Sequence, residues 1–139
     1  MTAPHLPLRL AAALPIALLA ACAPIEGDGE FVSLAPQARV VGEGETCVPA
    51  SRIRGTTVYD ARTIDFRVGT GLYRNTLPQS CPGLRARDAL TYDIRGGQLC
   101  RPDIVYVLED FGGELRRGTG CGLGDFVPIE LIEDKRDAS

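Results

Sequence analysis

The clearest pattern in this chain is an alternation of apolar and polar residues, which begins near position 63. Ile64, Phe66 and Val68 alternate with polar residues, as expected for a half-buried strand. A turn follows at Gly69-Thr70-Gly71, and residues 72–77 have the composition of a returning strand. Residues 53–58 predict a further strand, which a polar turn at 59–61 joins to the first. A period of two predicts a mainly β domain.

The second half of the chain continues this pattern. Leu90, Tyr92 and Ile94 alternate with polar residues, and Gly96-Gly97 predicts a hairpin turn toward residues 98–100. Residues 104–108 are apolar on both faces and β-branched, which favours a central buried strand. A helix that begins at Pro102-Asp103 is the competing interpretation.

Shorter segments complete the expected fold. Residues 112–113 and 118–124 predict loops, 85–89 a turn, and 126–129 a closing strand. Together these segments predict a small antiparallel β-barrel or sandwich of about five to seven short strands, with little helix.

The first 22 residues have the pattern of an export signal. Residues 10–21 contain no charged or strongly polar group, and such a run is too short to span a membrane, which takes about 20 apolar residues. The run ends in Leu19-Ala20-Ala21-Cys22, which resembles the bacterial lipobox. This resemblance implies cleavage after residue 21 and lipid attachment to Cys22. The alternative is ordinary secretion with cleavage at Ala21-Cys22-Ala23, which leaves Pro24 at the new terminus.

Lipidation implies a location and a domain organisation. Stable membrane attachment takes at least two acyl chains. In the enterobacterial sorting rule, an aspartate after the lipidated cysteine retains a lipoprotein in the inner membrane. Residue 23 is alanine, so resemblance to this rule implies the outer membrane. We expect a signal peptide (1–21), a lipidated flexible tether (22–45), a β domain (46–129) and an acidic disordered tail (130–139). The apolar run at 31–34 is the one tether segment that offers a short strand or helix to dock on the domain.

Four cysteines remain once Cys22 is assigned to the lipid: Cys47, Cys81, Cys100 and Cys121. An even number in an oxidising compartment predicts two disulfides. The cysteines are too widely separated for a typical zinc site, and they form no Cys-x-x-Cys redox motif. Three pairings are open, and we expect the nested one, Cys81–Cys100 with Cys47–Cys121.

The domain also resembles a family of small exported proteobacterial proteins that is defined by a domain of unknown function. The motifs that carry the resemblance are Ser51-Arg52-Ile53-Arg54, Asp60-Ala61-Arg62-Thr63-Ile64, Tyr73-Arg74-Asn75-Thr76-Leu77-Pro78, Cys81-Pro82-Gly83-Leu84, Leu99-Cys100 and Cys121-Gly122-Leu123-Gly124. The resemblance covers residues 46–129. It implies one domain with four paired cysteines, and it implies no activity.

Catalytic chemistry has few candidates in this sequence. The only histidine, His5, precedes the expected cleavage site, so the mature chain has no histidine-dependent nucleophile or metal site. Carboxylates are the remaining acid–base groups, and we consider Glu109-Asp110 and Asp60 with Asp65, which are typical of turns and strand surfaces. The glycines of 118–124 lack the lysine of a phosphate-binding loop and predict an irregular loop closed by a disulfide. We therefore predict no cofactor and no metal.

Arginine is the unusual feature of the domain. Residues 46–129 contain eleven arginines, no lysine and nine acidic residues. This small excess of positive charge is less than nucleic-acid binding requires. Arg52, Arg54, Arg67 and Arg74 lie on neighbouring expected strands and predict a face for an anionic ligand. The alternative is that these arginines pair across strands with four of the domain's aspartates, Asp60, Asp65, Asp88 and Asp93.

These features predict a non-catalytic, membrane-anchored envelope lipoprotein that faces the periplasm. We expect it to be an interaction or structural module for an envelope protein or an anionic envelope component. The competing hypothesis is a periplasmic, hydrolase-like enzyme that works with carboxylates alone.

Overall fold

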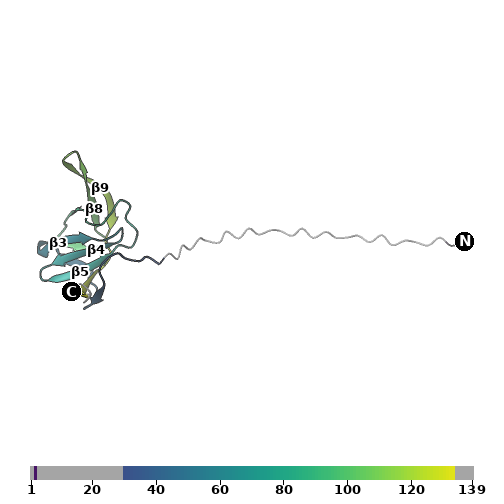
Figure 1. The fold of residues 1–139 in the computed structure, drawn as a ribbon, viewed down its shortest axis with the longest axis horizontal. Coiled ribbons are helices and arrows are strands. Elements are labelled where there is room, and N and C mark those ends of the chain that lie inside the picture. Colours follow the sequence, from purple (N-terminus) through teal and green to yellow (C-terminus); the bar gives the residue numbers. More distant parts are fainter. Residues whose placement is uncertain (1, 3–29, 134–139) are drawn as a thin grey trace, which may run out of the picture. The chain divides into compact units, whose positions relative to one another are not determined.

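The computed structural model describes residue 2 and residues 30–133, and the domain within them is mainly β (Figure 1). Residues 30–133 form ten strands and one 3-10 turn, η1 (Ala50–Arg52). The strands are β1 (Ala38–Val40), β2 (Cys47–Pro49), β3 (Ile53–Val58), β4 (Thr63–Val68), β5 (Gly71–Thr76), β6 (Leu90–Tyr92), β7 (Gln98–Cys100), β8 (Ile104–Phe111), β9 (Glu114–Gly122) and β10 (Phe126–Leu131). Their pairings are antiparallel, and across residues 30–133 the sheets do not close into a barrel. The predicted β class is confirmed, in its sandwich-like form.

The largest sheet has the strand order β1-β10-β5-β4-β3. Its best-predicted part is the β4–β5 hairpin, where Val68 pairs with Gly71 around a two-residue turn that includes Gly69 at a φ of 60°. Alternate residues of β4 enter the core, and the Phe66 ring meets the Phe126 ring of β10 edge-on, with centroids 5.2 Å apart. The alternation of the sequence thus identifies the core face correctly.

The second sheet has the order β6-β8-β9, with β8 at its centre. Residues 104–108 are thus a central strand, and the competing helix at Pro102-Asp103 is wrong. The loop predicted at 118–124 is also wrong for residues 118–122, because β9 continues to Gly122. Glycine is needed there for close packing: a Cβ at Gly120 would lie 2.8 Å from the Tyr106 ring.

The strand count exceeds the expected five to seven because the sequence pattern did not predict β1, β2 and β9. The turn predicted at Gly96-Gly97 is present, with Arg95 bridged to Gln98, but the strands on either side then separate. β6 pairs with β8, whereas β7 pairs with β2 in a two-stranded sheet. β1 and β2 have three residues each, which is too few for an alternating pattern to be recognised.

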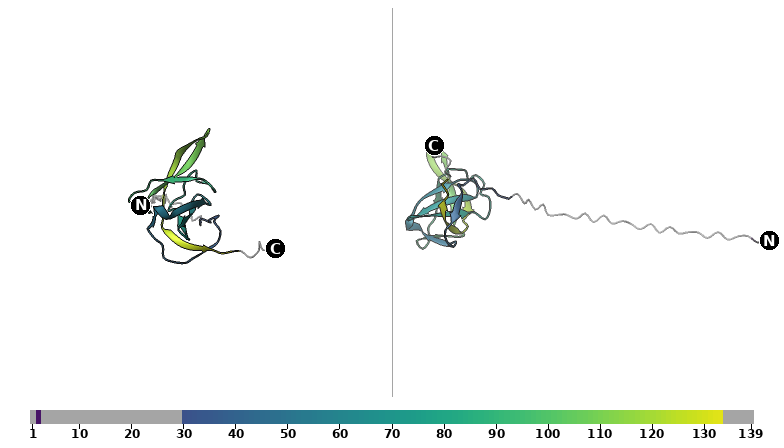
Figure 2. Two further views of the ribbon diagram at one scale, coloured as in Figure 1. Left: turned by 90° about the vertical axis from the view of Figure 1, so that its left-hand side faces the viewer. Right: turned by 60° about the horizontal axis from the view of Figure 1, so that its bottom comes forward.

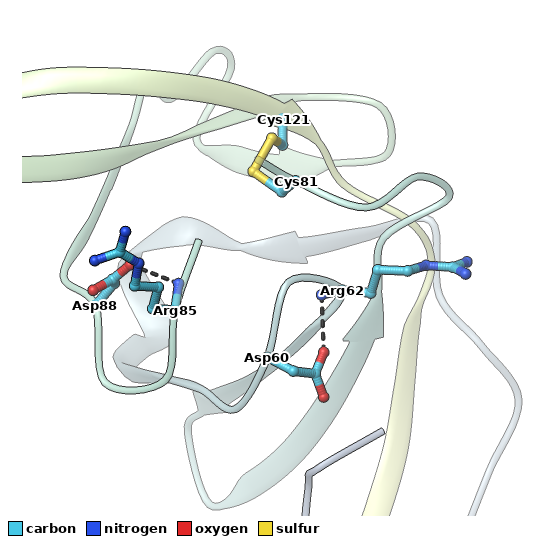
Figure 3. Close-up of a disulfide and its surroundings, with 6 residues drawn as sticks. All are labelled: Asp60, Arg62, Cys81, Arg85, Asp88 and Cys121. Atoms are coloured by element: carbon cyan, nitrogen blue, oxygen red, sulfur yellow. Dashed lines mark hydrogen bonds between the residues drawn. A yellow bond between two sulfur atoms is a disulfide. The ribbon is translucent and has the colours of Figure 1, made fainter. Parts of the chain in front are cut away.

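The two predicted disulfides are present, but the expected nested pairing is wrong. The bonds are Cys47–Cys100 and Cys81–Cys121, so the two closed loops interleave. Cys47 lies opposite Cys100 in the β2–β7 pair, with Cα atoms 4.0 Å apart. The second bond fastens the loop after β5 to the end of β9, as Figure 3 shows.

The folded unit is longer at both ends than the expected 46–129. β1 lies inside the expected tether and pairs with β10, and β10 itself continues to Leu131, inside the expected tail. The expected boundaries are wrong because backbone hydrogen bonds to a sheet edge need no apolar pattern in the added strand. Cys22 and the expected signal peptide lie outside the described residues, as do positions 134–139. In the part of the chain that is described, no helix has the length and hydrophobicity to cross a membrane.

A buried amide fixes β5 to the connection between β9 and β10. The side chain of Asn75 donates to the carbonyl oxygen of Gly124 and accepts from its N–H, each at 2.8 Å. A Cβ at Gly124 would lie 2.3 Å from the carbonyl oxygen of Thr76, so only glycine allows this approach. The glycine-rich segment therefore serves packing between strands.

Candidate functional site

The face of the large sheet that points away from the core carries charged residues, and we call it the outer face. On β4, Asp65 and Arg67 occupy it, and the register sets Arg74 of β5 opposite Asp65. Arg74 donates from Nε and Nη2 to the two carboxylate oxygens of Asp65 at 2.8 and 2.9 Å. The Asp65 side chain is 1% exposed and that of Arg74 17%, so this is a buried, bidentate ion pair.

Tyr59 extends this network. Burial, and then the negative charge of Asp65, raises the pKa of the Tyr59 hydroxyl, which therefore remains a neutral phenol. The guanidinium of Arg74 lies 5.8 Å from the centroid of the Tyr59 ring, and its Nη1 donates to the carbonyl oxygen of Pro36. Arg74 is thus bonded on several sides by structural partners.

The segment 31–37, which we call the strap, packs on the outer face. Asp60 accepts a hydrogen bond from the Ser33 hydroxyl at 3.0 Å and from the Leu34 N–H at 2.8 Å. The guanidinium of Arg62 lies 4.9 Å from the centroid of the Phe31 ring. The apolar run at 31–34 therefore docks on the domain, although without forming a strand or a helix.

Asp60 fastens the strap as a carboxylate. Burial alone raises the pKa of Asp60, but hydrogen bonds from the Arg62 and Leu34 N–H groups and from the Ser33 and Thr63 hydroxyls outweigh burial. The pKa of Asp60 in the folded protein is therefore below the ordinary aspartate value of 3.8. This stabilisation is complete above the ordinary pKa and is lost as the pH falls through the lowered one.

We expect the strap to detach from the outer face only in strong acid. An NMR titration of the Leu34 amide proton should show a transition below pH 3.8, because that proton is bonded to the Asp60 carboxylate. In Asp60→Asn the same proton should show no such transition. A wild-type transition above the ordinary aspartate pKa would contradict this assignment.

Three of the four candidate arginines remain open to a ligand. Arg52, Arg54 and Arg67 are exposed, and none of them makes an ion pair with a carboxylate within residues 30–133. We call these three the arginine corner. The assignment of the fourth arginine, Arg74, to a free ligand-binding face is wrong, because its guanidinium is bonded to Asp65.

The fold brings the arginine corner together at one end of the β3–β4 pair. Gly55 pairs with Arg67, and a bulge inserts Arg54 just before Gly55. The guanidinium of Arg52 lies against Gly69 in the β4–β5 turn, 2.7 Å from where a Cβ would stand. Three like charges therefore share the corner where the start of β3, the end of β4 and the β4–β5 turn meet.

The other expected ion pairs differ in their outcomes. Asp93 pairs with Arg117, at 2.7 Å. Asp88 accepts instead from the backbone N–H of Arg85 within a turn, as drawn in Figure 3, and this bond confirms the turn predicted at 85–89. Cross-strand pairing thus accounts for Arg74 and Arg117 and leaves the arginine corner unexplained.

Three of the four carboxylates considered for catalysis, Asp60, Asp65 and Asp110, have structural roles. Asp60 and Asp65 are buried rather than on the surface, and both are hydrogen-bonded to the groups described above. Asp110 accepts from the Gly113 N–H in the β8–β9 turn. Within the described residues, no three histidine, cysteine or acidic side chains are placed to hold a metal ion.

The hollow beside the Cys81–Cys121 disulfide has a volume of about 340 Å³. Its lining consists of Pro78, Gln79, Ser80, Pro82 and residues 120–122, so it contributes no ionisable side chain to the candidate site.

The strap and the Asp65–Arg74 pair were anticipated only in part. Residues 31–34 were expected to dock as a short strand or helix, and pairing of arginines with Asp65 was the alternative to a free arginine face. The apolar run at 31–34 was the only signal for the strap. For Asp65, the register of the β4–β5 hairpin predicts Arg74 as its neighbour once Val68 is paired with Gly71.

Comparisons with known proteins give no match: no protein-family model, no curated protein and no solved structure is similar to this chain. The resemblance to small exported proteobacterial proteins therefore stays a prediction.

Proposed function

We propose that this chain is a lipid-anchored envelope protein whose domain binds an anionic envelope component through the arginine corner, without catalysis. The proposed ligand group is an oxyanion, either carboxylate or phosphate, because a guanidinium donates two parallel hydrogen bonds to such a group. The lipobox-like Leu19-Ala20-Ala21-Cys22 supports the anchor, and Ala23 supports the outer membrane as its location. The two disulfides agree with an oxidising compartment.

One observation carries the binding proposal. Arg52, Arg54 and Arg67 are exposed neighbours, and none of the five ion pairs among the described residues includes them. Like charges at neighbouring strand positions destabilise a sheet, and an anion that binds between them relieves this repulsion. The absence of lysine from residues 46–129 adds to the case, since arginine is better suited to bidentate binding.

The environment of the buried acids supports the non-catalytic part of the proposal. A general acid or base must reach a substrate, whereas both oxygens of Asp65 accept hydrogen bonds from Arg74. Asp60 likewise accepts from the strap and from the Arg62 N–H. Acid–base chemistry at either residue would first require breaking these bonds.

Replacing the arginine corner with glutamine, in Arg52→Gln/Arg54→Gln/Arg67→Gln, should weaken binding to an anionic envelope polymer by at least about tenfold. Each exposed charge pair contributes up to about 1 kcal/mol, and three are lost together. Binding is measured with the full-length protein purified from membranes of exporting cells. One arm uses cell-wall sacculi, which carry carboxylates, and the other uses lipopolysaccharide, which carries phosphates.

The matched control removes three exposed arginines that do have acidic partners: Arg39, Arg101 and Arg117. It changes the net charge equally but should leave most of the affinity intact. Equal loss in both variants, or no binding of the wild-type protein to either polymer, would contradict a specific corner. The intact mass of the same sample, before and after reduction, reports the lipid on Cys22 and the two disulfides.

A further inference from the structure

The β8–β9 hairpin extends beyond the body of the domain and ends in an open strand edge (Figures 1 and 2). β9 is the outermost strand of the sheet β6-β8-β9, and residues 114–117 are all exposed. Two large apolar side chains lie in this part of the hairpin: Leu115 is 63% exposed and Phe111 is 56% exposed. An open edge with apolar side chains is a template for another strand.

The geometry of the turn decides which backbone groups face this edge. Phe111 pairs with Glu114 around Gly112–Gly113, whose φ values of 67° and 92° are those of a tight two-residue hairpin turn. Residues that flank such a turn exchange hydrogen bonds with each other, and bonded and non-bonded pairs then alternate. The N–H and C=O groups of Leu115 and Arg117 therefore point toward the open edge.

The hydrogen bonds that β8 makes on the side away from β9 agree with this alternation. Leu108 lies opposite Arg117, and its N–H donates to the carbonyl oxygen of Ala89, away from β9. The usable edge is short, because a bulge at residues 118–119 interrupts the β8–β9 pairing between Tyr106 and Leu108. The regular edge therefore runs from Glu114 to Arg117.

Charge determines which partner strand fits this edge. When a second β9 pairs antiparallel with Leu115 opposite Leu115, Glu114 of each copy faces Arg116 of the other. A shift of two residues in one direction places Glu114 opposite Glu114, and the same shift in the other direction places Arg116 opposite Arg116. Opposite charges stabilise a cross-strand pair and like charges destabilise it, so the edge is self-complementary in a single register.

We propose that a second copy of this chain pairs with β9 in this register, which joins the two three-stranded sheets into one. Leu115 would pack against Leu115 of the second copy on one face of the joined sheet. On the other face, Arg116 would lie between Glu109 of its own chain and Glu114 of the second copy. The Arg116–Glu114 pair within one chain is 61% and 69% exposed, so exchanging it for the intermolecular pair costs little.

The contact is small, so the pairing is weak in dilute solution and becomes substantial where copies are concentrated. Anchoring to one membrane surface raises the effective concentration of neighbouring copies. That increase rests on the proposed lipid anchor, whereas the register of the pairing does not. The arginine corner takes no part in it, so the two proposals fail independently.

The register is tested by cysteine crosslinking of the full-length protein in exporting cells. Leu115→Cys should form a covalent dimer under non-reducing conditions, because position 115 faces itself across the two-fold axis. Arg117→Cys is the register control and should form little dimer, since position 117 faces Gly113 of the second copy. Intact mass and peptide mapping confirm that both native disulfides are retained in each variant.

Charge reversals within the Leu115→Cys chain test the complementarity. Glu114→Arg alone and Arg116→Glu alone should each lower the dimer fraction by about tenfold, because two attractive pairs become repulsive. The double reversal exchanges the two charges and should restore the dimer. A free thiol at position 115, equal crosslinking at 115 and 117, crosslinking that ignores the charges, or capture of a different protein would each overturn the proposal.

Discussion

Replacing Arg74 with alanine is expected to lower the free energy of unfolding by about 3–5 kcal/mol, the largest loss for any single arginine of this domain. The reason is that Asp65 would remain 98% buried with no cation to balance its charge. Domains of this size are stable by only about 5–15 kcal/mol, so the variant would lose much of its margin. Chemical denaturation of the full-length protein measures the difference.

Arg67→Ala is the matched control, because Arg67 shares the same face and strand pair but is exposed and has no acidic partner among the described residues. It should change stability by no more than about 0.5 kcal/mol. The double variant Asp65→Leu/Arg74→Leu removes both charges, so it should be far more stable than Arg74→Ala. Equal losses in Arg74→Ala and Arg67→Ala would show that the buried pair does not matter.

The sequence predicts the fold best where a strand is long enough to alternate and a glycine turn follows it. The β4–β5 hairpin meets both conditions, so its strands, turn and core face could all be predicted. β8 was predictable for another reason: its β-branched, apolar residues favour a strand over a helix, although only Val105 and Val107 are buried and Ile104 is 41% exposed. In these segments the local preference and the tertiary environment agree.

The remaining strands depend on neighbours that are distant in sequence. β1 lies in a segment rich in proline, glycine and acids, and it becomes a strand because the edge of β10 is free to pair with it. The pairing of Cys47 with Cys100 likewise follows from the β2–β7 register, which three-residue strands do not reveal. Spacing alone allows three pairings, and the structure is needed to choose among them.

The candidate site was predicted in composition but not in detail. Arg52, Arg54 and Arg67 do gather, because a hairpin and a bulge bring neighbouring strand ends together. Arg74 was misassigned because an aspartate on an alternating strand is normally a solvent-facing residue. Asp65 is instead buried, since Arg74 neutralises its charge and the adjoining part of the sheet is covered by the strap.

Removing either disulfide should cost about 4 kcal/mol of unfolding free energy. In the chain-entropy model the stabilisation grows with the logarithm of the loop length, and the two loops span 53 and 40 residues. The two loops are similar in length, so Cys47→Ala/Cys100→Ala and Cys81→Ala/Cys121→Ala should be destabilised by nearly equal amounts. Denaturation of each variant against the wild-type protein, both without reductant, measures the two costs.

A third variant tests the pairing itself. Cys81→Ala/Cys100→Ala keeps one cysteine from each bond, so Cys47 and Cys121 should both titrate as free thiols in the unfolded chain. Its stability should fall below that of either paired variant, because it has lost both crosslinks rather than one. If it instead retained a disulfide and matched the paired variants in stability, the nested arrangement would be correct. The β2–β7 register and the link between β9 and the loop after β5 would then both be wrong.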